Sequence, residues 1–341
     1  MPAGLHPVGP AAHPVALAEY TRGPCVESVH LGYLEVFSAA GERLLSLGDS
    51  PHIFPRSAVK PMQALPTVSR GAAAQFDLRR EHLAIMCASH AAQPFHQQAV
   101  REILERVGAS EADLYCGPHA IPDRETAEAL IRAGGQPTRL HNNCSGKHAG
   151  MLALARLLGE PPAGYWEPTG AVQREIQRAF GVLIGRPADS FQWGVDGCGV
   201  PTYLLEVREL ALGFARLANP ETLPAPEADG ARQICAAMTA KPEYVQGTGR
   251  FNTVLMEALP GQVIVKGGAE GCGAIGVLGK GLGIAAKVQD GSARALPAIL
   301  LEAMARFDLL PKPLPKSLAP LRRPSVLNTR GAVVGECRVL F

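Results

Sequence analysis

One stretch of the sequence decides the fold: Pro55-Arg56-Ser57-Ala58-Val59-Lys60-Pro61-Met62-Gln63-Ala64-Leu65. Pro61 would break the interior of a helix, but the first turn tolerates a proline because its N–H groups have no partner within the helix. A helix here must therefore begin near Ser57, where the helix dipole favours negative charge. Ser57 and Lys60 then lie on one side of the helix, so the amine can reach the hydroxyl.

The spacing of Ser57 and Lys60, S-x-x-K, suits nucleophilic catalysis. A serine hydroxyl is a poor nucleophile until a base takes its proton, and a lysine can do so if burial or a nearby cation keeps it neutral. The pattern is short, however, and by itself it more often marks a capping serine and a solvated lysine. Further motifs have to decide between the two interpretations.

Two later segments supply a second serine and a second lysine. Cys87-Ala88-Ser89-His90 follows a short apolar segment, and Lys266-Gly267-Gly268 ends a predicted strand. The two glycines allow a substrate to approach the backbone closely. The order of S-x-x-K, serine loop and late lysine matches the layout of penicillin-recognising enzymes, except that glycine stands at the middle position of the third motif.

Strands are predicted at both ends of the chain and helices in its middle. Strand patterns cover residues 26–34, 44–47, 263–266, 274–278 and 283–288, with hairpins joining the first two and the last two. Helical patterns cover residues 94–107, 123–133, 148–158, 172–180, 203–217 and 293–306, and residues 219–230 are a predicted proline-rich loop. This order predicts an α/β fold of the α+β type, an antiparallel β-sheet flanked by helices.

The length of 341 residues, 47% of them hydrophobic, allows a large core without disulfide bonds. We expect residues 1–24 to form an N-terminal extension and residues 25–341 to form one domain, with a helical subdomain over residues 90–190.

Charge and composition restrict the partners and the compartment. The net charge is only +2, from 33 basic and 31 acidic residues without a basic block, which argues against nucleic-acid binding. We find neither a signal peptide nor a segment of about 18 apolar residues that could span a membrane. The eight cysteines are scattered, as in proteins of reducing compartments. The sequence therefore predicts a cytoplasmic protein that acts on a small molecule.

A metal site is a further possibility from the residue types. Cys144 and His148 form a C-x-x-x-H pair in a polar segment before a predicted helix, and Cys198 offers a second thiol. Two thiolates and a nitrogen suit zinc, with water in the fourth position. Polar clusters at helix starts also serve as caps, and the tight C-x-x-C pairs of many zinc sites are absent. Spacing alone leaves the site open.

Six blocks of the sequence, in this order, resemble the rhizobial-type, class 3 L-asparaginases (asparaginase II), a family of serine–lysine amidohydrolases. The blocks are residues 57–63, 87–90, 116–119, 142–148, 195–201 and 266–271. The resemblance extends from residue 25 to the C-terminus. It implies hydrolysis of asparagine to aspartate and ammonia, a fold similar to serine β-lactamases and penicillin-binding proteins, and a homodimer.

The resemblance also implies the roles of individual residues. The catalytic residues would be two serine–lysine pairs, Ser57 with Lys60 and Ser89 with Lys266. Substrate contacts would come from Arg56, His90, Asp196 and Gly267, with Asp196 also near the metal. The zinc ligands would be Cys144, Lys147 and Cys198, so Lys147 replaces His148 as the nitrogen ligand. Only a neutral lysine can bind a metal, which requires the metal to lower the pKa of Lys147.

One position departs from the family pattern. Ala91-Ala92 follows Ser89-His90, where the family commonly has Gly-Glu, and the missing carboxylate can alter substrate preference. The expected reaction is acyl transfer to Ser57 or Ser89, with Ser57 preferred. Two alternatives remain at this point: a penicillin-recognising serine hydrolase, and a family member that binds zinc or an amino acid without catalysis.

Overall fold

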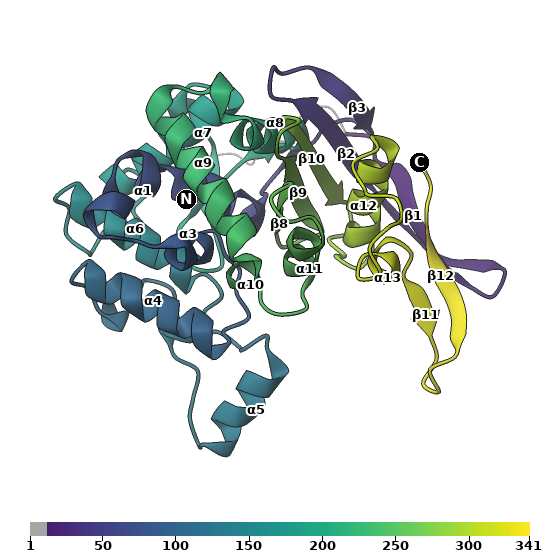
Figure 1. Ribbon diagram of the computed structural model, residues 1–341, viewed down its shortest axis with the longest axis horizontal. Coiled ribbons are helices and arrows are strands. Elements are labelled where there is room, and N and C mark those ends of the chain that lie inside the picture. Colours follow the sequence, from purple (N-terminus) through teal and green to yellow (C-terminus); the bar gives the residue numbers. More distant parts are fainter. Residues whose placement is uncertain (1–11) are drawn as a thin grey trace, which may run out of the picture.

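An antiparallel sheet joins the two ends of the chain in the computed structural model, which describes residues 12–341 (Figure 1). Its strand order is β11-β12-β1-β2-β10-β9-β8, and β3 pairs with β2 outside this path. The strands are β1 Val15–Arg22, β2 Cys25–Ser38, β3 Arg43–Leu47, β8 Val263–Gly267, β9 Cys272–Val277, β10 Leu282–Val288, β11 Ser325–Leu327 and β12 Val333–Val339. Short strands outside it are β4 His52–Ile53, β5 Trp193–Val195, β6 Pro201–Tyr203 and β7 Leu205–Glu206.

The middle of the chain is helical, as predicted. Its helices are α1 Lys60–Ser69, α2 Ala72–Gln75, α3 Arg80–Met86, α4 Pro94–Arg106, α5 Arg124–Arg132, α6 Ser145–Leu157, α7 Ala171–Ile184, α8 Val207–Ala218, α9 Ala225–Ala240, α10 Pro242–Val245 and α11 Phe251–Ala258. Helices α12 Leu296–Arg306 and α13 Ala319–Arg322 follow β10. The 3-10 helices are η1 Arg56–Val59, η2 Glu111–Asp113, η3 Arg139–His141, η4 Ala188–Ser190 and η5 Pro220–Thr222.

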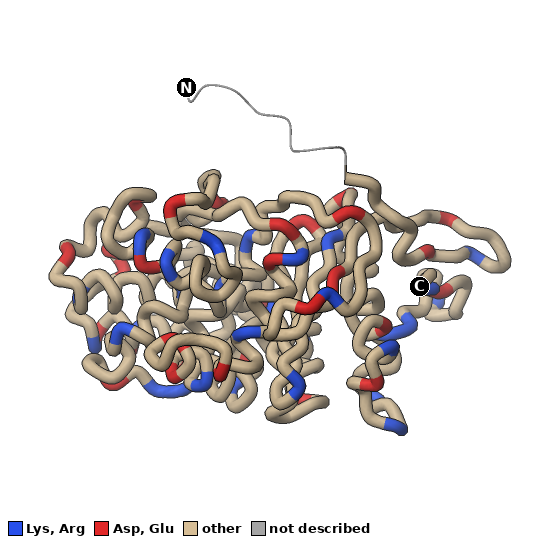
Figure 2. Tube along the Cα trace, turned by 90° about the horizontal axis from the view of Figure 1, so that it is seen from above, with Lys and Arg blue, Asp and Glu red and all other residues tan. Residues whose placement is uncertain are grey.

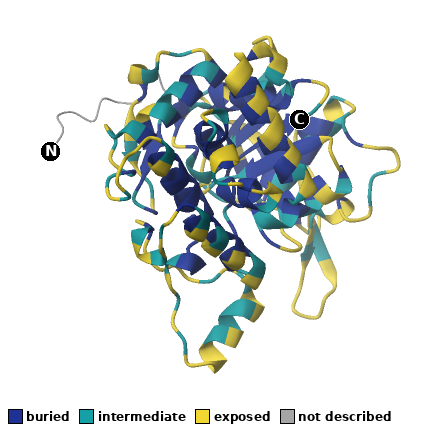
Figure 3. Ribbon diagram, turned by 60° about the vertical axis from the view of Figure 1, so that its left-hand side comes forward, coloured by how far each residue is buried: buried dark blue, intermediate teal, exposed yellow. Residues whose placement is uncertain are grey.

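Helices cover the sheet and form a second body beside it. Helices α8 and α12 pack on the central strands, while α1, α3, α6, α7 and α9 pack on one another next to the sheet (Figure 1). The central strands β8, β9 and β10 and the helix faces turned toward them are buried, whereas β3, β11 and most of β12 are exposed or half-buried (Figure 3). The predicted α+β architecture, an antiparallel sheet flanked by helices, is therefore confirmed.

Close contact between α8 and the sheet requires glycine. A Cβ atom at Gly283 on β10 would lie 1.9 Å from the carbonyl oxygen of Ala211 on α8, and one at Gly276 would lie 2.8 Å from that of Phe214. No larger residue fits these distances unless the helix moves. The glycines of the C-terminal hairpin thus allow the helical layer to rest directly on the strands.

The predicted hairpins, loop and domain boundary can be compared with the observed elements. The predicted hairpins are β2 with β3 and β9 with β10. The loop predicted over residues 219–230 is wrong from residue 225 on, because α9 begins there and its proline lies in the first turn, which tolerates one. The domain boundary expected at residue 25 lies after β1, whose residues pair with β2 and β12 in the main sheet. Residues 1–11 of the expected extension lie outside the described residues.

Charge is distributed evenly along the chain, with basic and acidic residues interspersed (Figure 2). Among residues 12–341, no helix is long and apolar enough to cross a membrane.

Candidate active site

Segments that are far apart in the sequence surround one cavity of about 600 Å³. They are η1, the loop after α3, the loop before α6, the turn between β5 and β6, the end of β8 and the first turn of α11. Ser57, Ser89, Cys144 and Asp196 all line this cavity. The structure therefore brings the predicted motifs together in one place.

The backbone before α1 positions Ser57 at the cavity. Pro61 lies in the first turn of α1, and η1 precedes it, so the helical segment begins near Ser57 as predicted. Arg56 has φ 51°, a left-handed conformation that a residue with a side chain adopts rarely. Such strained residues concentrate at functional sites, where the surrounding structure holds them in place.

Gly268 allows the end of β8 to contact η1. A Cβ atom at Gly268 would lie 2.4 Å from the carbonyl oxygen of Pro55 and 3.0 Å from the amide nitrogen of Ala58. At Gly267, by contrast, a Cβ would lie at an ordinary 3.7 Å from Oδ1 of Asn252. The glycine that the geometry requires is therefore Gly268, because it lets the strand bearing Lys266 pack against the segment bearing Ser57.

Lys60 is completely buried and contacts the loop that holds Ser89. Its Nζ donates to the carbonyl oxygen of Ala88 at 2.5 Å, to Oγ of Ser89 at 3.1 Å and to Sγ of Cys144 at 3.1 Å. The backbone amide of Lys60 donates to the carbonyl oxygen of Ser57, but within the described residues no hydrogen bond joins Nζ of Lys60 to the hydroxyl of Ser57. The predicted contact within S-x-x-K is thus replaced by a contact from Lys60 to the second serine.

Lys266 approaches the same hydroxyl from β8. Its Nζ lies 2.9 Å from Oγ of Ser89 and 2.6 Å from the carbonyl oxygen of Gly267. Lys266 is fully buried, and this burial, together with the cation of Lys60, lowers the pKa of Lys266 well below its usual range. Ser89 therefore lies between two buried amines, and that of Lys266 has the properties of a base.

Two backbone hydrogen bonds hold the loop of Ser89. The amide of Ser89 donates to the carbonyl oxygen of Val245 at 3.0 Å, and the amide of His90 donates to that of Asn143 at 3.1 Å. The ring of His90 is used in the same way: Nδ1 accepts from the amide of Ala92, and Nε2 lies 2.9 Å from Oγ of Ser145. Both ring nitrogens are thus occupied by the protein, and burial lowers the pKa of His90 well below its usual range.

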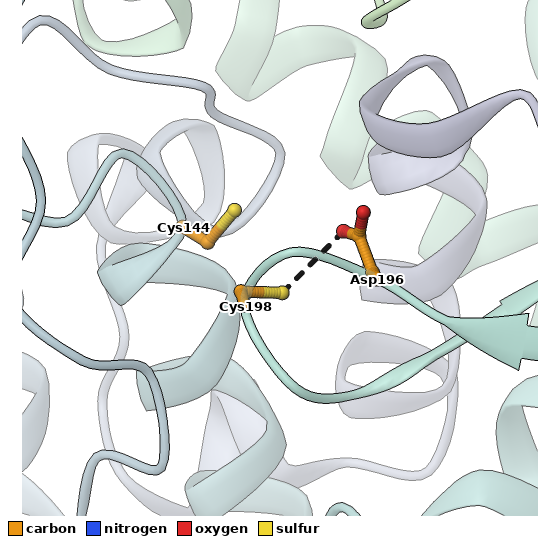
Figure 4. Close-up of side chains that lie close together, drawn as sticks. All are labelled: Cys144, Asp196 and Cys198. Carbon is orange, nitrogen blue, oxygen red and sulfur yellow. Dashed lines mark hydrogen bonds between the residues drawn. The ribbon is translucent and has the colours of Figure 1, made fainter.

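A second cluster lies beside the amines and contains two thiols and a carboxylate. The ligand atoms of Cys144, Asp196 and Cys198 all lie within 4.8 Å of one another (Figure 4). Nζ of Lys147 lies 2.9 Å from Sγ of Cys198 and 3.8 Å from Oδ2 of Asp196. The structure therefore gathers the three residues expected to bind zinc, with Asp196 beside them.

The charges of this second cluster are mutually stabilised. A hydrogen bond with Cys144 and the ammonium of Lys147 lower the pKa of Cys198 to about 5, although burial opposes this. Burial also opposes the charge of Lys147, but the sulfur atoms of Cys198 and Cys144 hold the pKa of Lys147 above its usual range. Burial likewise opposes the ionisation of Asp196, yet the cations of Lys147 and Arg56 lower its pKa to about 2.

The remaining residues singled out in the sequence lie in different parts of the site or outside it. Arg56 donates to Oδ1 of Asp196 at 2.5 Å, so both substrate-contact candidates lie in one ion pair at the cavity. His148, the first candidate for the nitrogen ligand, is not part of the cluster, and its Nδ1 lies 2.6 Å from the hydroxyl of Tyr165. Ala91, at the position that departs from the family pattern, is buried and lines the cavity.

No sequence pattern identified three polar residues of the cavity: Gln246, Arg250 and the buried Asn252. Asn252 lies in the first turn of α11, outside the six recognised blocks, and its side chain is 1% exposed. No spacing pattern links it to the motifs. Its only indication in the sequence is that it is one of two polar residues, Asn252 and Thr253, that precede the apolar residues 254–256 of this helix.

Comparison with known proteins assigns the family. Residues 18–339 match the family described as L-asparaginase II. Two similar solved structures, titled "Crystal Structure Analysis of Mglu" and "Crystal structure of Mglu in its native form in the presence of 4.3M NaCl", each align with 82% of this chain at 17% identity. The alignments cover 67% and 61% of those chains, with TM-scores of 0.35 and 0.36. No curated protein matches the chain. Because the family match spans nearly all of its length, the chain belongs to the L-asparaginase II family, whose members are asparaginase-type amidohydrolases.

Proposed function

We propose that the protein hydrolyses L-asparagine to L-aspartate and ammonia through an acyl-serine intermediate. One observation supports this most strongly: Oγ of Ser89 lies 2.9 Å from Nζ of Lys266 and 3.1 Å from Nζ of Lys60, at the wall of the cavity that Ser57 also lines. A hydroxyl held by a buried neutral amine is the arrangement that activates a serine.

In the proposed mechanism, Ser89 and Lys266 transfer the proton. The neutral amine of Lys266 accepts the proton of Ser89, and the Ser89 oxygen either attacks the carbon of the substrate amide itself or takes the proton of Ser57, whose oxygen then attacks. Backbone N–H groups at the start of η1, which have no partner within the helix, would stabilise the oxyanion. The proton held by Lys266 passes to the leaving nitrogen, ammonia departs, and water hydrolyses the acyl-serine in the reverse order.

We also propose that a zinc ion binds to Cys144, Lys147 and Cys198, near Asp196. The donor set fits, because two sulfur atoms and a carboxylate lie within 4.8 Å of one another and the amine of Lys147 lies 2.9 Å from one of the sulfurs. When bound, the ion would supply positive charge that orients the polar groups of the substrate. The ion pair of Arg56 with Asp196 holds the carboxylate at the edge of the cavity.

Two further properties follow from the resemblance and belong to the proposal. The eight cysteines are all free, which is consistent with a reducing, cytoplasmic compartment. A homodimer is expected from the family, and light scattering of the purified protein measures its mass directly.

The function is tested by ammonia release from asparagine, glutamine and β-aspartyl amides, with and without a chelator. Ser57→Ala and Ser89→Ala should each lower the rate on asparagine, while Ser69→Ala, outside the cavity, should not. Mass spectrometry of the quenched reaction should find an aspartyl group on one of the two serines of the cavity. Near-normal rates in both cavity variants would exclude the serine mechanism.

The two alternatives give different results in the same experiments. A penicillin-recognising hydrolase would be labelled by a fluorescent penicillin and would release no ammonia from asparagine. A binding protein would hold asparagine without forming product.

A further inference from the structure

The strongest unexplained feature of the cavity is the side chain of Asn252. It is 1% exposed, and neither its Nδ2 nor its Oδ1 has a hydrogen-bond partner within the described residues. Leaving a buried amide unpaired forfeits its hydrogen bonds to water without replacement, so proteins rarely retain one without a use. The backbone amide of the same residue, in contrast, donates to Oε1 of Gln246 at 2.8 Å.

The position of Asn252 relates it to the reacting groups. It lines the cavity, and its Oδ1 lies 3.7 Å from the place a Cβ would occupy at Gly267. The carbonyl oxygen of Gly267 accepts from Nζ of Lys266, and the same amine contacts Ser89. Asn252 therefore lies next to the strand end that carries the base, and glycine at position 267 leaves the space between them open.

We propose that Asn252 is a specificity-determining residue that pairs with the carboxamide of the substrate. This inference rests on the proposed amidohydrolase function. Oδ1 accepts a hydrogen from the substrate NH₂ group, and Nδ2 donates to the substrate carbonyl oxygen, so two amides satisfy each other with parallel hydrogen bonds. The torsion about the Cβ–Cγ bond of asparagine is soft, and a rotation about it turns the amide toward the cavity.

This pairing explains why both atoms are unpaired in the free protein. A site that recognises only a carbonyl oxygen needs a donor, and one that recognises an ammonium needs an acceptor. An unpaired donor and an unpaired acceptor on one rigid group match a ligand with the same two functions on one carbon, which is a primary carboxamide. A polar group kept unpaired for its ligand also discriminates strongly against analogues that lack the matching atom.

The test compares an amide with an ester of the same acid. Asn252→Leu, which keeps the volume of the side chain, should lower kcat/KM for L-asparagine about 10- to 100-fold. It should lower kcat/KM for L-aspartate β-methyl ester by only about 3- to 10-fold and always less than for asparagine, because the ester keeps the carbonyl oxygen that Nδ2 contacts but has no N–H group for Oδ1. Asn252→Ala gives the same comparison if the leucine variant does not fold.

The control is Ser69→Ala at the end of α1, outside the cavity, which removes a buried hydroxyl oxygen that also has no hydrogen-bond partner within the described residues. It should leave both substrates unchanged. Equal losses for amide and ester, or no loss for either, would overturn the inference. A fall in Tm of Asn252→Leu together with equal losses would assign a structural role instead. Absence of ammonia release by the unaltered protein would contradict the proposed function, and this outcome is separate from the amide-to-ester ratio of the variants.

Discussion

Lys266 and Lys147 are two buried lysines beside one cavity, and their surroundings drive their amines in opposite directions. Nζ of Lys266 contacts the hydroxyl of Ser89 and the carbonyl oxygen of Gly267. Burial, followed by the nearby cation of Lys60, holds the pKa of Lys266 well below its usual range. Lys147 is as deeply buried, yet the sulfur atoms of Cys198 and Cys144 outweigh burial and hold its pKa above the usual range. Burial alone therefore does not determine the charge of a lysine.

The difference assigns the two halves of the site. A neutral amine next to Ser89 can accept a proton, so the Lys266 half is the reactive one in the proposed mechanism. The ammonium of Lys147 stabilises the negative charges of the thiolate and the carboxylate beside it. In this half of the site, a metal ion could take the place of the proton on Lys147. The same substitution in the two halves should therefore have different consequences.

Replacing the base should have the largest effect. Lys266→Met removes the proton acceptor of Ser89 and should lower kcat by about 10²- to 10⁴-fold. Because the amine is neutral, its loss leaves no unpaired charge, and the free energy of unfolding should change little. Ammonia release and urea unfolding check the two expectations, and Lys287→Met on β10, outside the cavity, is the matched control. A variant with near-normal kcat would remove Lys266 from the reaction.

Replacing Lys147 by methionine should lower the stability of the protein, in contrast to the same replacement of Lys266. Lys147→Met leaves the thiolate of Cys198 buried without its cation and leaves Asp196 with Arg56 alone, and should lower the free energy of unfolding by about 3–5 kcal/mol. Urea unfolding of the chelator-treated protein measures this. An unchanged midpoint would show that Lys147 is not an ammonium in the folded protein.

Contact between β8 and η1 can be broken without altering the thiol cluster. Gly268→Ala places a Cβ 2.4 Å from the carbonyl oxygen of Pro55, which must move. A shift of Ser57 and Lys266 relative to each other should lower kcat about 10²-fold. Gly267→Ala meets only an ordinary 3.7 Å contact and should retain the fold and Tm. Zinc affinity should be unchanged in Gly268→Ala; if it falls in parallel with kcat, the two halves are not independent.

The dependence on pH sharpens the account of Lys266. The neutral amine is the reactive form, so kcat/KM should fall as the pH is lowered through the pKa of Lys266 and be retained above it. Because burial and the cation of Lys60 lower this pKa, activity should persist at neutral pH. Lys60→Gln removes the cation and should move the acid limb of the pH–rate profile upward by about one unit. A limb that stays in place would assign the shift to burial alone.

The sequence predicted the local parts of this site and not how they contact each other. Pro61 placed the start of the helical segment, and strand patterns gave β8 and the position of Lys266. The contact of Lys60 with Ser89, in place of Ser57, depends on the loop after α3, which is held by Val245 and Asn143 from distant parts of the chain. No local pattern encodes such contacts.

The same limit applies to the fold. Hairpins between neighbouring strands were predicted because turn residues mark them, whereas β1 pairs with β12 through Ala18 and Val339, nearly the whole chain apart. Residues of α9 were assigned to a loop because prolines dominate their start. Ring contacts of His90 explain its burial, and they depend on Ser145 in α6, which no spacing rule connects to it.

The central claim is that Ser89 and Lys266 act as one proton-transfer unit, and a double-mutant comparison tests it most directly. Ser89→Ala, Lys266→Met and the double variant are assayed for kcat/KM on L-asparagine. Residues that act as a unit are non-additive, so the double variant should be no slower than the slower single variant. Losses that multiply in the double variant, or a single variant that retains the normal rate, would contradict the claim.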